Sequence, residues 1–219
     1  MARTALIAGS TGLIGSFLLQ KLLDSRDYDR VVAVTRRPLS PSQLDSNPKL
    51  GNPTSDFEHL GALGKQLAAD DVYCCLGTTT AKAGGQAGLE RVDYHMVLDL
   101  ARSARAAGAT QFLVVSAVGA SLRSPAFYSR VKARMERSVA EAGYATVHIL
   151  RPSLLLGARQ ESRLAEDVAQ RLSPLLSPLF SGRLSQYRPV QAEEVAAAML
   201  ALAQRPASGV HIHHHPFLD

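Results

Sequence analysis

The strongest chemical signal in the sequence is a glycine-rich turn whose glycines are spaced three residues apart. Bare backbone lets a pyrophosphate approach closely, and the start of a helix offers unpaired N–H groups with a partial positive charge. The turn lies between an apolar run and a segment with helical spacing, which favours a dinucleotide site; a ligand-free turn is the alternative. It consists of Gly9, Ser10, Thr11, Gly12, Leu13, Ile14 and Gly15.

Two arginines follow the next predicted strand, at the place where an NAD-specific site carries a carboxylate. The run there is Thr35, Arg36 and Arg37. A guanidinium binds a 2′-phosphate through two hydrogen bonds, whereas a carboxylate repels it. We therefore expect NADP(H) in preference to NAD(H). The alternative is a pair of solvated arginines.

A tyrosine and a lysine are spaced for one face of a helix. Tyr128 and Lys132 are four residues apart, and the preceding predicted strand ends at Ser116. Many helices carry this pair by chance. In a chain that also has a nucleotide turn, the pair becomes a candidate for catalysis.

The cysteines and the terminal histidines are weaker candidates. Cys74 and Cys75 are adjacent and form no CxxC or zinc spacing, so we expect two buried thiols in a reducing compartment. On a strand, alternate histidines near the end of the chain would share one face and form a metal-binding stripe. Because exposed histidine runs often bind metals only adventitiously, we expect no metal site. The histidines are His211, His213, His214 and His215.

Strands alternate with helices along the chain, which predicts an α/β fold. We expect a single Rossmann-type domain over residues 1–219, built on a doubly wound parallel sheet. Inward-facing positions of the second helix are expected at Val92, Met96, Leu98, Leu100 and Ala101. Strands are predicted at 4–8, 31–34, 72–76, 111–115, 145–150 and 210–213, and helices at 13–23, 88–107, 127–142 and 193–204.

Two segments interrupt this alternation. Residues 38–54 are rich in Pro, Ser and Asn and predict a surface loop. Residues 172–189 combine leucines with several prolines, which indicates a pocket wall or lid. We expect residues 153–190 to form most of the substrate side as a small C-terminal extension.

The composition restricts the class of partner. The net charge of +5 favours anionic ligands, but the basic residues are dispersed, so nucleic acid is a minor alternative. No apolar run is long enough to span a bilayer, and the N-terminal segment does not resemble a signal peptide. We expect a cytoplasmic protein that acts on a small molecule, with a homodimer left open.

At this point the sequence resembles the short-chain dehydrogenase/reductases. The glycine turn and the Tyr128–Lys132 pair mark the superfamily. The stretches 74–79 and 159–163, which read CCLGTT and RQESR, are similar to an atypical branch, that of the oxidoreductase-like Tat-interacting proteins. The resemblance covers nearly the whole chain and is weakest at 38–55 and after 165.

The resemblance implies a role for each matching residue. Tyr128 would protonate a carbonyl oxygen, Lys132 would hold the nicotinamide ribose and lower the phenol pKa, and Ser116 would hydrogen-bond the carbonyl. A free phenol titrates near pH 10, so function at neutral pH needs a downward shift of about three units. The remaining cofactor contacts implied are Asp56 and Phe57 beside the adenine, Leu76, Gly77, Thr78 and Thr79 along the ribose and nicotinamide, and Pro152 and Ser153 at the nicotinamide amide.

Some positions depart from the family pattern. Ala117 and Val118 replace the usual second serine, for which Ser121 is a substitute in the following loop. Asp93 stands nearest to the position of a relay asparagine, and Ser153 replaces a glycine. Two hypotheses follow. The first is an NADP(H)-dependent oxidoreductase acting on a small carbonyl or alcohol, and the second is an NADP(H)-binding regulatory or sensor protein with little catalysis.

Overall fold

The protein is built on a seven-stranded parallel sheet in the order β3-β2-β1-β4-β5-β6-β9. The structure is a computed structural model and describes residues 3–156, 186–205 and 207–218. This arrangement confirms the predicted Rossmann-type parallel sheet. Its strands are β1 (Thr4–Ala8), β2 (Arg30–Val34), β3 (Leu50–Gly51), β4 (Asp71–Cys74), β5 (Gln111–Val115), β6 (Thr146–Arg151) and β9 (Gly209–His214).

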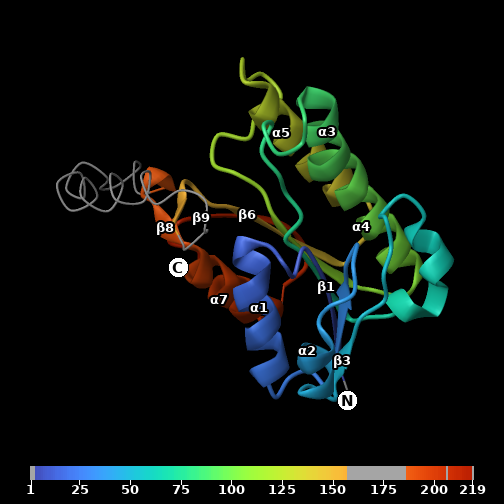
Figure 1. Cartoon of the computed structure of the whole chain (residues 1–219). Helices are drawn as coiled ribbons and strands as arrows, with labels where there is room; N and C mark the ends of the chain where they lie inside the picture. Colours follow the sequence, from blue (N-terminus) through green and yellow to red (C-terminus); the bar gives the residue numbers. More distant parts are fainter. Residues whose placement is uncertain (1–2, 157–185, 206, 219) are drawn as a thin grey trace.

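The sheet is covered by helices on both faces (Figure 1). Helices α1 (Leu13–Asp24) and α7 (Ala192–Ala203) pack on one face. The other face is covered by α4 (Met96–Ala106), α5 (Phe127–Ala140) and a 3₁₀ segment, η1 (Leu60–Leu67). Strands buried on both sides need apolar side chains in succession, which explains the continuous apolar runs in the sequence.

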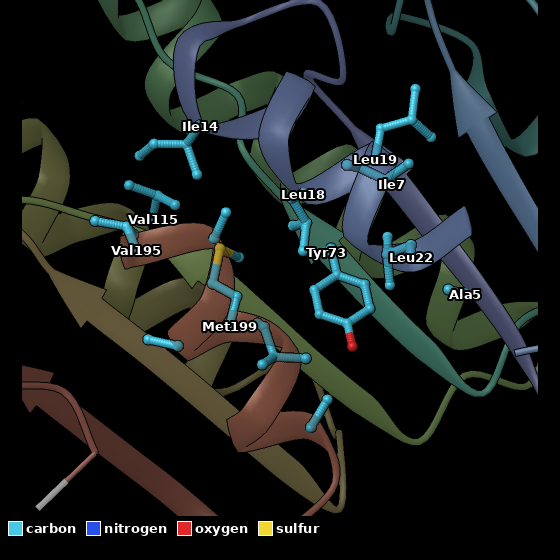
Figure 2. Packing of buried hydrophobic residues seen from close by; sticks show 14 of the residues in the cluster. Ala5, Ile7, Ile14, Leu18, Leu19, Leu22, Tyr73, Val115, Val195 and Met199 are labelled. Carbon is cyan, nitrogen blue, oxygen red and sulfur yellow. The ribbon is translucent and has the colours of Figure 1, made fainter. Parts of the chain in front are cut away.

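The core between the sheet, α1 and α7 shows this packing directly (Figure 2). Leu18 and Leu22 from α1 meet Met199 from α7 over the side chain of Tyr73 on β4. These side chains are almost completely excluded from water, and each buried leucine stabilises the fold by about 2 kcal/mol. The core therefore holds α1, and with it the glycine turn, at a fixed place on the sheet.

The order in which strands are added to the sheet changes direction between the neighbouring strands β1 and β4. Strands β1 to β3 proceed toward one edge, and β4 returns to the other side of β1. Ligands of open parallel sheets bind at the carboxyl ends of the strands at such a reversal. Here those ends lead into Gly9 and Cys75, so the predicted nucleotide turn lies at the expected place.

The second predicted helix is interrupted by a π-helical turn. It comprises α3 (Gln86–Glu90), η2 (Arg91–His95) and α4, where the sequence predicted one helix over 88–107. The turn contains Asp93, whose buried carboxylate makes polar contacts described below. Of the predicted inward positions, Met96, Leu98, Leu100 and Ala101 are buried and Val92 is half-buried.

The prediction of an unbroken loop over residues 38–54 is wrong. The segment contains a short helix, α2 (Pro41–Asp45), and strand β3. Ser40 caps the helix through the backbone N–H of Gln43, whose side chain in turn accepts from Ser40, and Pro41 stands in the first turn. This reciprocal capping allows a polar, proline-containing segment to form a helical turn.

A second, two-stranded sheet joins β7 (Leu155–Leu156) to β8 (Val190–Gln191). The sequence predicted a pocket wall over 172–189; residues 172–185 lie outside the described residues, as does the 159–163 stretch. Within the described ranges, no helix is long and apolar enough to cross a membrane.

Candidate cofactor and catalytic site

Close backbone packing requires glycine at two of the three glycine positions of the turn, Gly9 and Gly15. Gly9 has a φ of +83°, and a Cβ there would lie 2.5 Å from the carbonyl oxygen of Cys75. A Cβ on Gly15 would lie 2.0 Å from the carbonyl oxygen of Gly9. Any larger residue would push α1 away from the sheet. At Gly12 the space is less tight, and its N–H donates to the Gly9 carbonyl at 2.9 Å.

The turn has the features of an anion site. Gly12 is the N-cap of α1, and no side chain caps the first N–H groups. The first turn contains no acidic residue, and the buried Ser10 hydroxyl has no hydrogen-bond partner in the described structure. Thr11 is exposed, whereas Leu13 is half-buried and Ile14 is packed in the core. The turn thus offers backbone N–H groups and one unpaired hydroxyl, which fits a pyrophosphate.

The two arginines follow β2, the strand that pairs with β1. Both Arg36 and Arg37 are exposed, and neither guanidinium has a side-chain partner among the residues described. The Thr35 hydroxyl donates to the carbonyl oxygen of Arg37 at 2.7 Å and fixes the start of this segment. Two cations therefore stand next to the strand that leads into the glycine turn.

The two residues predicted beside an adenine have different environments. Asp56 is exposed, and a hydrogen bond from the backbone N–H of Glu58 holds the pKa of its carboxyl below the ordinary value. Phe57 is only 2% exposed and packs into the core beside η1 and α4. Its ring presents no face to a ligand in this structure, so the predicted adenine contact would need the ring to move.

The loop after β4 is attached to Asp93. The backbone N–H of Thr78 donates to Asp93 Oδ2 at 2.9 Å. A Cβ on Gly77 would lie 3.5 Å from Asp93 Oδ1, so this glycine faces the carboxylate. Leu76 is half-buried and Thr79 is exposed. The predicted cofactor segment 76–79 therefore borders Asp93, the same buried group that Lys132 on α5 contacts.

Lys132 forms a buried ion pair with Asp93. Its Nζ lies 2.9 Å from Asp93 Oδ1, and both side chains are at most 3% exposed. The same Nζ donates to the carbonyl oxygen of Val115 at 3.1 Å. Burial lowers the pKa of Lys132, but the carboxylate of Asp93, together with Tyr128, raises it, and the net shift is upward. The lysine is thus charged and held in place by these two contacts.

Tyr128 stands one helical turn before Lys132 and is 38% exposed. Lys132 Nζ lies 6.0 Å from the centre of its ring. Burial raises the pKa of the phenol above 10.0, Lys132 lowers it and Asp93 raises it, with a net upward shift. The expected net lowering by Lys132 is therefore absent, because burial opposes it and Asp93 neutralises much of the lysine charge.

Ser116 is joined to Glu136, which the sequence motifs did not single out, and through it to Arg151. Its Oγ donates to Glu136 Oε1 at 2.5 Å, and Arg151 binds the same carboxylate through Nε at 2.9 Å and a terminal nitrogen at 2.6 Å. A signal was present, because Tyr128, Lys132 and Glu136 follow one another at intervals of four on α5.

The residues predicted at the nicotinamide amide lie at the end of β6. Pro152 is buried, and its carbonyl oxygen accepts from the N–H of Val118 at 2.9 Å. The Ser153 hydroxyl donates to the carbonyl oxygen of Arg188. These two hydrogen bonds join the end of β6 to the loop after Ser116 and to the residues just before β8.

Three of the histidines form a group outside this site, namely His148, His211 and His213. His148 on β6 and His213 on β9 are joined through Nδ1 and Nε2 at 2.9 Å, and the rings of His148 and His211 stack at 5.3 Å. Burial and the neighbouring imidazoles lower the pKa of His148 to about 4. A separate group of donor atoms comes from the exposed residues Asp56, Glu58 and His59, and Arg91 binds Glu58.

The cysteines lie on opposite faces of the sheet, as alternation along a strand predicts. Cys74 belongs to the core on the α4 and α5 side, whereas Cys75 packs toward α7, with its thiol 3.9 Å from the Met199 sulfur. Burial raises the pKa of the Cys74 thiol to about 12. Neither environment activates a thiolate.

The comparisons with known proteins agree with this geometry. Residues 5–215 match the NAD dependent epimerase/dehydratase family. The protein HTATIP2 of Rattus norvegicus is 33% identical over 208 residues, covering 94% of this chain and 84% of that protein. The mitochondrial protein fmp52 of Aspergillus niger is 34% identical over 185 residues, covering 83% and 79%.

Solved structures of low sequence identity share the fold. MoeE5 in complex with UDP-glucuronic acid and NAD superposes with a TM-score of 0.71 at 19% identity, covering 96% of this chain and 75% of that one. A UDP-glucose 4-epimerase from Thermotoga maritima gives a TM-score of 0.68 at 17% identity, covering 96% and 76%.

The comparison also corrects one expectation. The sequence alone predicted a cytoplasmic protein, but the fungal relatives at 31–34% identity are named mitochondrial. The cytoplasmic prediction is therefore wrong. It rested on the lack of a recognisable leader or membrane segment, which is a weak basis for assigning a compartment.

Proposed function

The chain belongs to the NAD dependent epimerase/dehydratase family, in the branch of HTATIP2 and Fmp52, and on this premise we propose that it is an NADP(H)-dependent oxidoreductase. Its substrate is a small carbonyl compound or the corresponding alcohol. One observation carries the proposal: Tyr128 and Lys132 share a face of α5 at the carboxyl edge of the sheet, where Gly77 faces the Lys132–Asp93 pair.

The residues present fit a phosphorylated dinucleotide. The glycine turn and the start of α1 would hold the pyrophosphate, and Arg36 and Arg37 would hold the 2′-phosphate. When bound, the nicotinamide supplies or accepts a hydride. Asp56, the 76–79 loop, Lys132, Pro152 and Ser153 would line the rest of the cofactor.

The state of Tyr128 suits the role of a general acid. Because its pKa is raised, the phenol carries its proton at neutral pH and can donate it to a carbonyl oxygen that becomes negatively charged. Its exposure leaves the hydroxyl accessible to a substrate. In the reverse reaction, alcohol oxidation, the phenol would first have to lose its proton. The negative charge of Asp93 opposes this loss because it raises the phenol pKa.

Lys132 would contribute charge and position. Its ammonium group contacts both Asp93 and the Val115 carbonyl. A ribose hydroxyl would have to join or replace one of these partners. The carboxylate of Asp93 therefore determines how strongly the positive charge of Lys132 acts on the phenol and on the cofactor.

The same ion pair favours a second candidate, an NADP(H)-binding regulatory protein with little turnover. Asp93 neutralises Lys132 in a buried environment, and the Tyr128 pKa is raised instead of lowered. Both features would slow proton transfer in the oxidative direction. Hydride transfer to any compound in a screen with NADPH would rule out this second function.

The test is the replacement Tyr128→Phe. NADPH oxidation is followed by absorbance with a panel of small aldehydes, ketones and quinones. We expect turnover to fall by a factor of about 100 or more while NADPH affinity is unchanged. Tyr144 precedes the amino end of β6, and its hydroxyl donates to the carbonyl oxygen of Ala101. It provides a matched control, and Tyr144→Phe should keep full activity. Undiminished turnover in Tyr128→Phe would contradict the proposal.

A further inference from the structure

Behind the end of β5, three side chains form a buried chain of charge-assisted hydrogen bonds. Ser116 and Glu136 are 3% and 6% exposed, and the side chain of Arg151 is 19% exposed. The Glu136 carboxylate accepts one hydrogen bond from the Ser116 hydroxyl and two from the Arg151 guanidinium. The mechanism proposed above gives no role to Glu136 or Arg151.

The chemistry of these groups determines the direction of the serine proton. A carboxylate only accepts hydrogen bonds and a guanidinium only donates them, so Ser116 must donate its single proton to Glu136. Bonds of this kind are short and strong, and breaking one costs a factor of about ten to one hundred in an equilibrium. The hydroxyl proton of Ser116 therefore stays in the hydrogen bond to Glu136. Toward a ligand, Ser116 Oγ can act only as a hydrogen-bond acceptor.

This serine lies beside the proposed reaction centre. Lys132 donates to the carbonyl oxygen of Val115, which directly precedes Ser116, at 3.1 Å. Tyr128, Lys132 and Glu136 occupy successive turns of α5 on the same face. The proton donor Tyr128 and the acceptor Ser116 are thus brought to the same edge of the sheet.

We propose that Glu136 is a positioning residue that makes Ser116 a hydrogen-bond acceptor, so that the substrate site favours a hydroxyl group over the matched carbonyl group. The inference deepens the proposed function and rests on it, since it concerns the substrate oxygen of that site. It reverses the expected role of Ser116 as a donor to a carbonyl.

The preference for the alcohol follows from the number of hydroxyl protons available for hydrogen bonding. An alcohol donates its own O–H to Ser116 Oγ while the serine remains bonded to Glu136. A ketone has no proton to give, and it gains a bond from Ser116 only when the serine leaves Glu136. We expect the alcohol to bind about tenfold or more tightly than the ketone.

The replacement Glu136→Gln inverts the arrangement without changing the size of the side chain. Arg151 donates to both carboxylate oxygens, and Ser116 shares Oε1 with Arg151 Nε. We expect the carboxamide oxygen to keep the shorter bond, to the terminal nitrogen of Arg151, which places the amide nitrogen at the Oε1 position beside Ser116. Ser116 then accepts from the amide, and its own proton becomes available to a ligand. The preference for the alcohol should disappear or reverse. Ser116→Ala should show no preference, and Ser116→Thr, which retains a hydroxyl, should keep it.

Two measurements test this on the full chain without any dinucleotide, so that they do not depend on turnover. Proton NMR should show a slowly exchanging hydroxyl resonance far downfield that is lost in Ser116→Ala and Glu136→Gln. Ligand-observed NMR with cyclohexanol and cyclohexanone gives the ratio of affinities, and circular dichroism verifies the fold of each variant.

The possible outcomes separate this inference from the proposed function. A downfield resonance together with an alcohol preference that Glu136→Gln removes supports it, even if no turnover is ever detected. The absence of the resonance in the natural protein, no binding of either compound, or equal affinities for both overturns it, even if Tyr128→Phe behaves as expected.

Discussion

Lys132 Nζ lies 2.9 Å from Asp93 Oδ1 in a place where both side chains are almost completely buried. This pair connects the helical segment after β4 to α5, and Asp93 also accepts a hydrogen bond from the backbone N–H of Thr78 in the 76–79 loop. A buried charge without its partner is far more costly than a buried pair, because it has lost hydration without compensation.

The first prediction concerns the coupling between these two charges. Asp93→Ala leaves the Lys132 ammonium unpaired and should lower the free energy of unfolding by about 3–5 kcal/mol. The double variant with Lys132→Met should recover much of this loss, since no buried charge remains. Urea unfolding of the two single variants and the double variant gives the coupling energy, and purely additive losses would contradict the prediction.

The second prediction concerns the glycine turn. Gly15→Ala places a Cβ 2.0 Å from the backbone oxygen of Gly9, and the backbone cannot move aside without displacing α1. We expect a loss of about 3 kcal/mol or more in unfolding free energy, together with loss of dinucleotide binding. Gly61 is the matched control, because a Cβ there meets nothing within 4 Å. Gly61→Ala should change neither quantity appreciably; a tolerated Gly15→Ala would count against the packing described.

The third prediction is a pH dependence that originates at His148. Burial and the imidazoles of His213 and His211 lower its pKa from 6.5 to about 4. The unfolded chain therefore binds a proton that the folded chain does not, and this contribution to stability is complete above pH 6.5 and is lost as the pH falls toward 4. A change of this size corresponds to a loss of about 3 kcal/mol.

Urea unfolding between pH 7 and pH 4 measures this contribution as a difference between variants. His148→Phe keeps a ring of similar size and removes the titration, so its stability should fall less with acid than that of the natural protein. His59 is exposed, and His59→Gln should leave the pH profile unchanged. Identical profiles for His148→Phe and the natural protein would exclude His148 as the source.

The fourth prediction concerns the choice of dinucleotide. Arg36→Asp places a carboxylate where a 2′-phosphate is proposed to bind. The affinity for NADPH should fall by a factor of about ten to one hundred, with little change for NADH. Fluorescence titration with both dinucleotides measures the two affinities. An equal loss for both would show that Arg36 does not select the phosphorylated form.

Most of the fold was predictable because buried parallel strands and their helices leave strong periodic signals. Strand β5 begins and ends at the predicted residues, and α1 and α5 differ from prediction only at their C-terminal ends. The short helix α2 was missed, because its stability comes from the local capping by Ser40 and Gln43 and not from an apolar face. The strands β7 and β8 contain two residues each and have no periodicity to detect.

The candidate site was predictable only in part. Sequence motifs identified the turn, Tyr128, Lys132 and Ser116, all of which the fold places near the carboxyl edge of the sheet. The partners that set their electrostatics come from distant segments: Asp93 from a π-helical turn, and Arg151 from the end of β6. No local pattern indicates that a helical aspartate will meet a lysine 39 positions later, because the contact depends on how the helices pack.

Isothermal titration calorimetry of the purified protein with NADPH and NADH tests the central claim most directly. The account predicts binding of a single dinucleotide per chain, with NADPH bound more tightly than NADH. If neither of these reduced dinucleotides nor their oxidised forms gave any heat of binding, the glycine turn would not be a cofactor site. The proposed oxidoreductase activity would then have no basis.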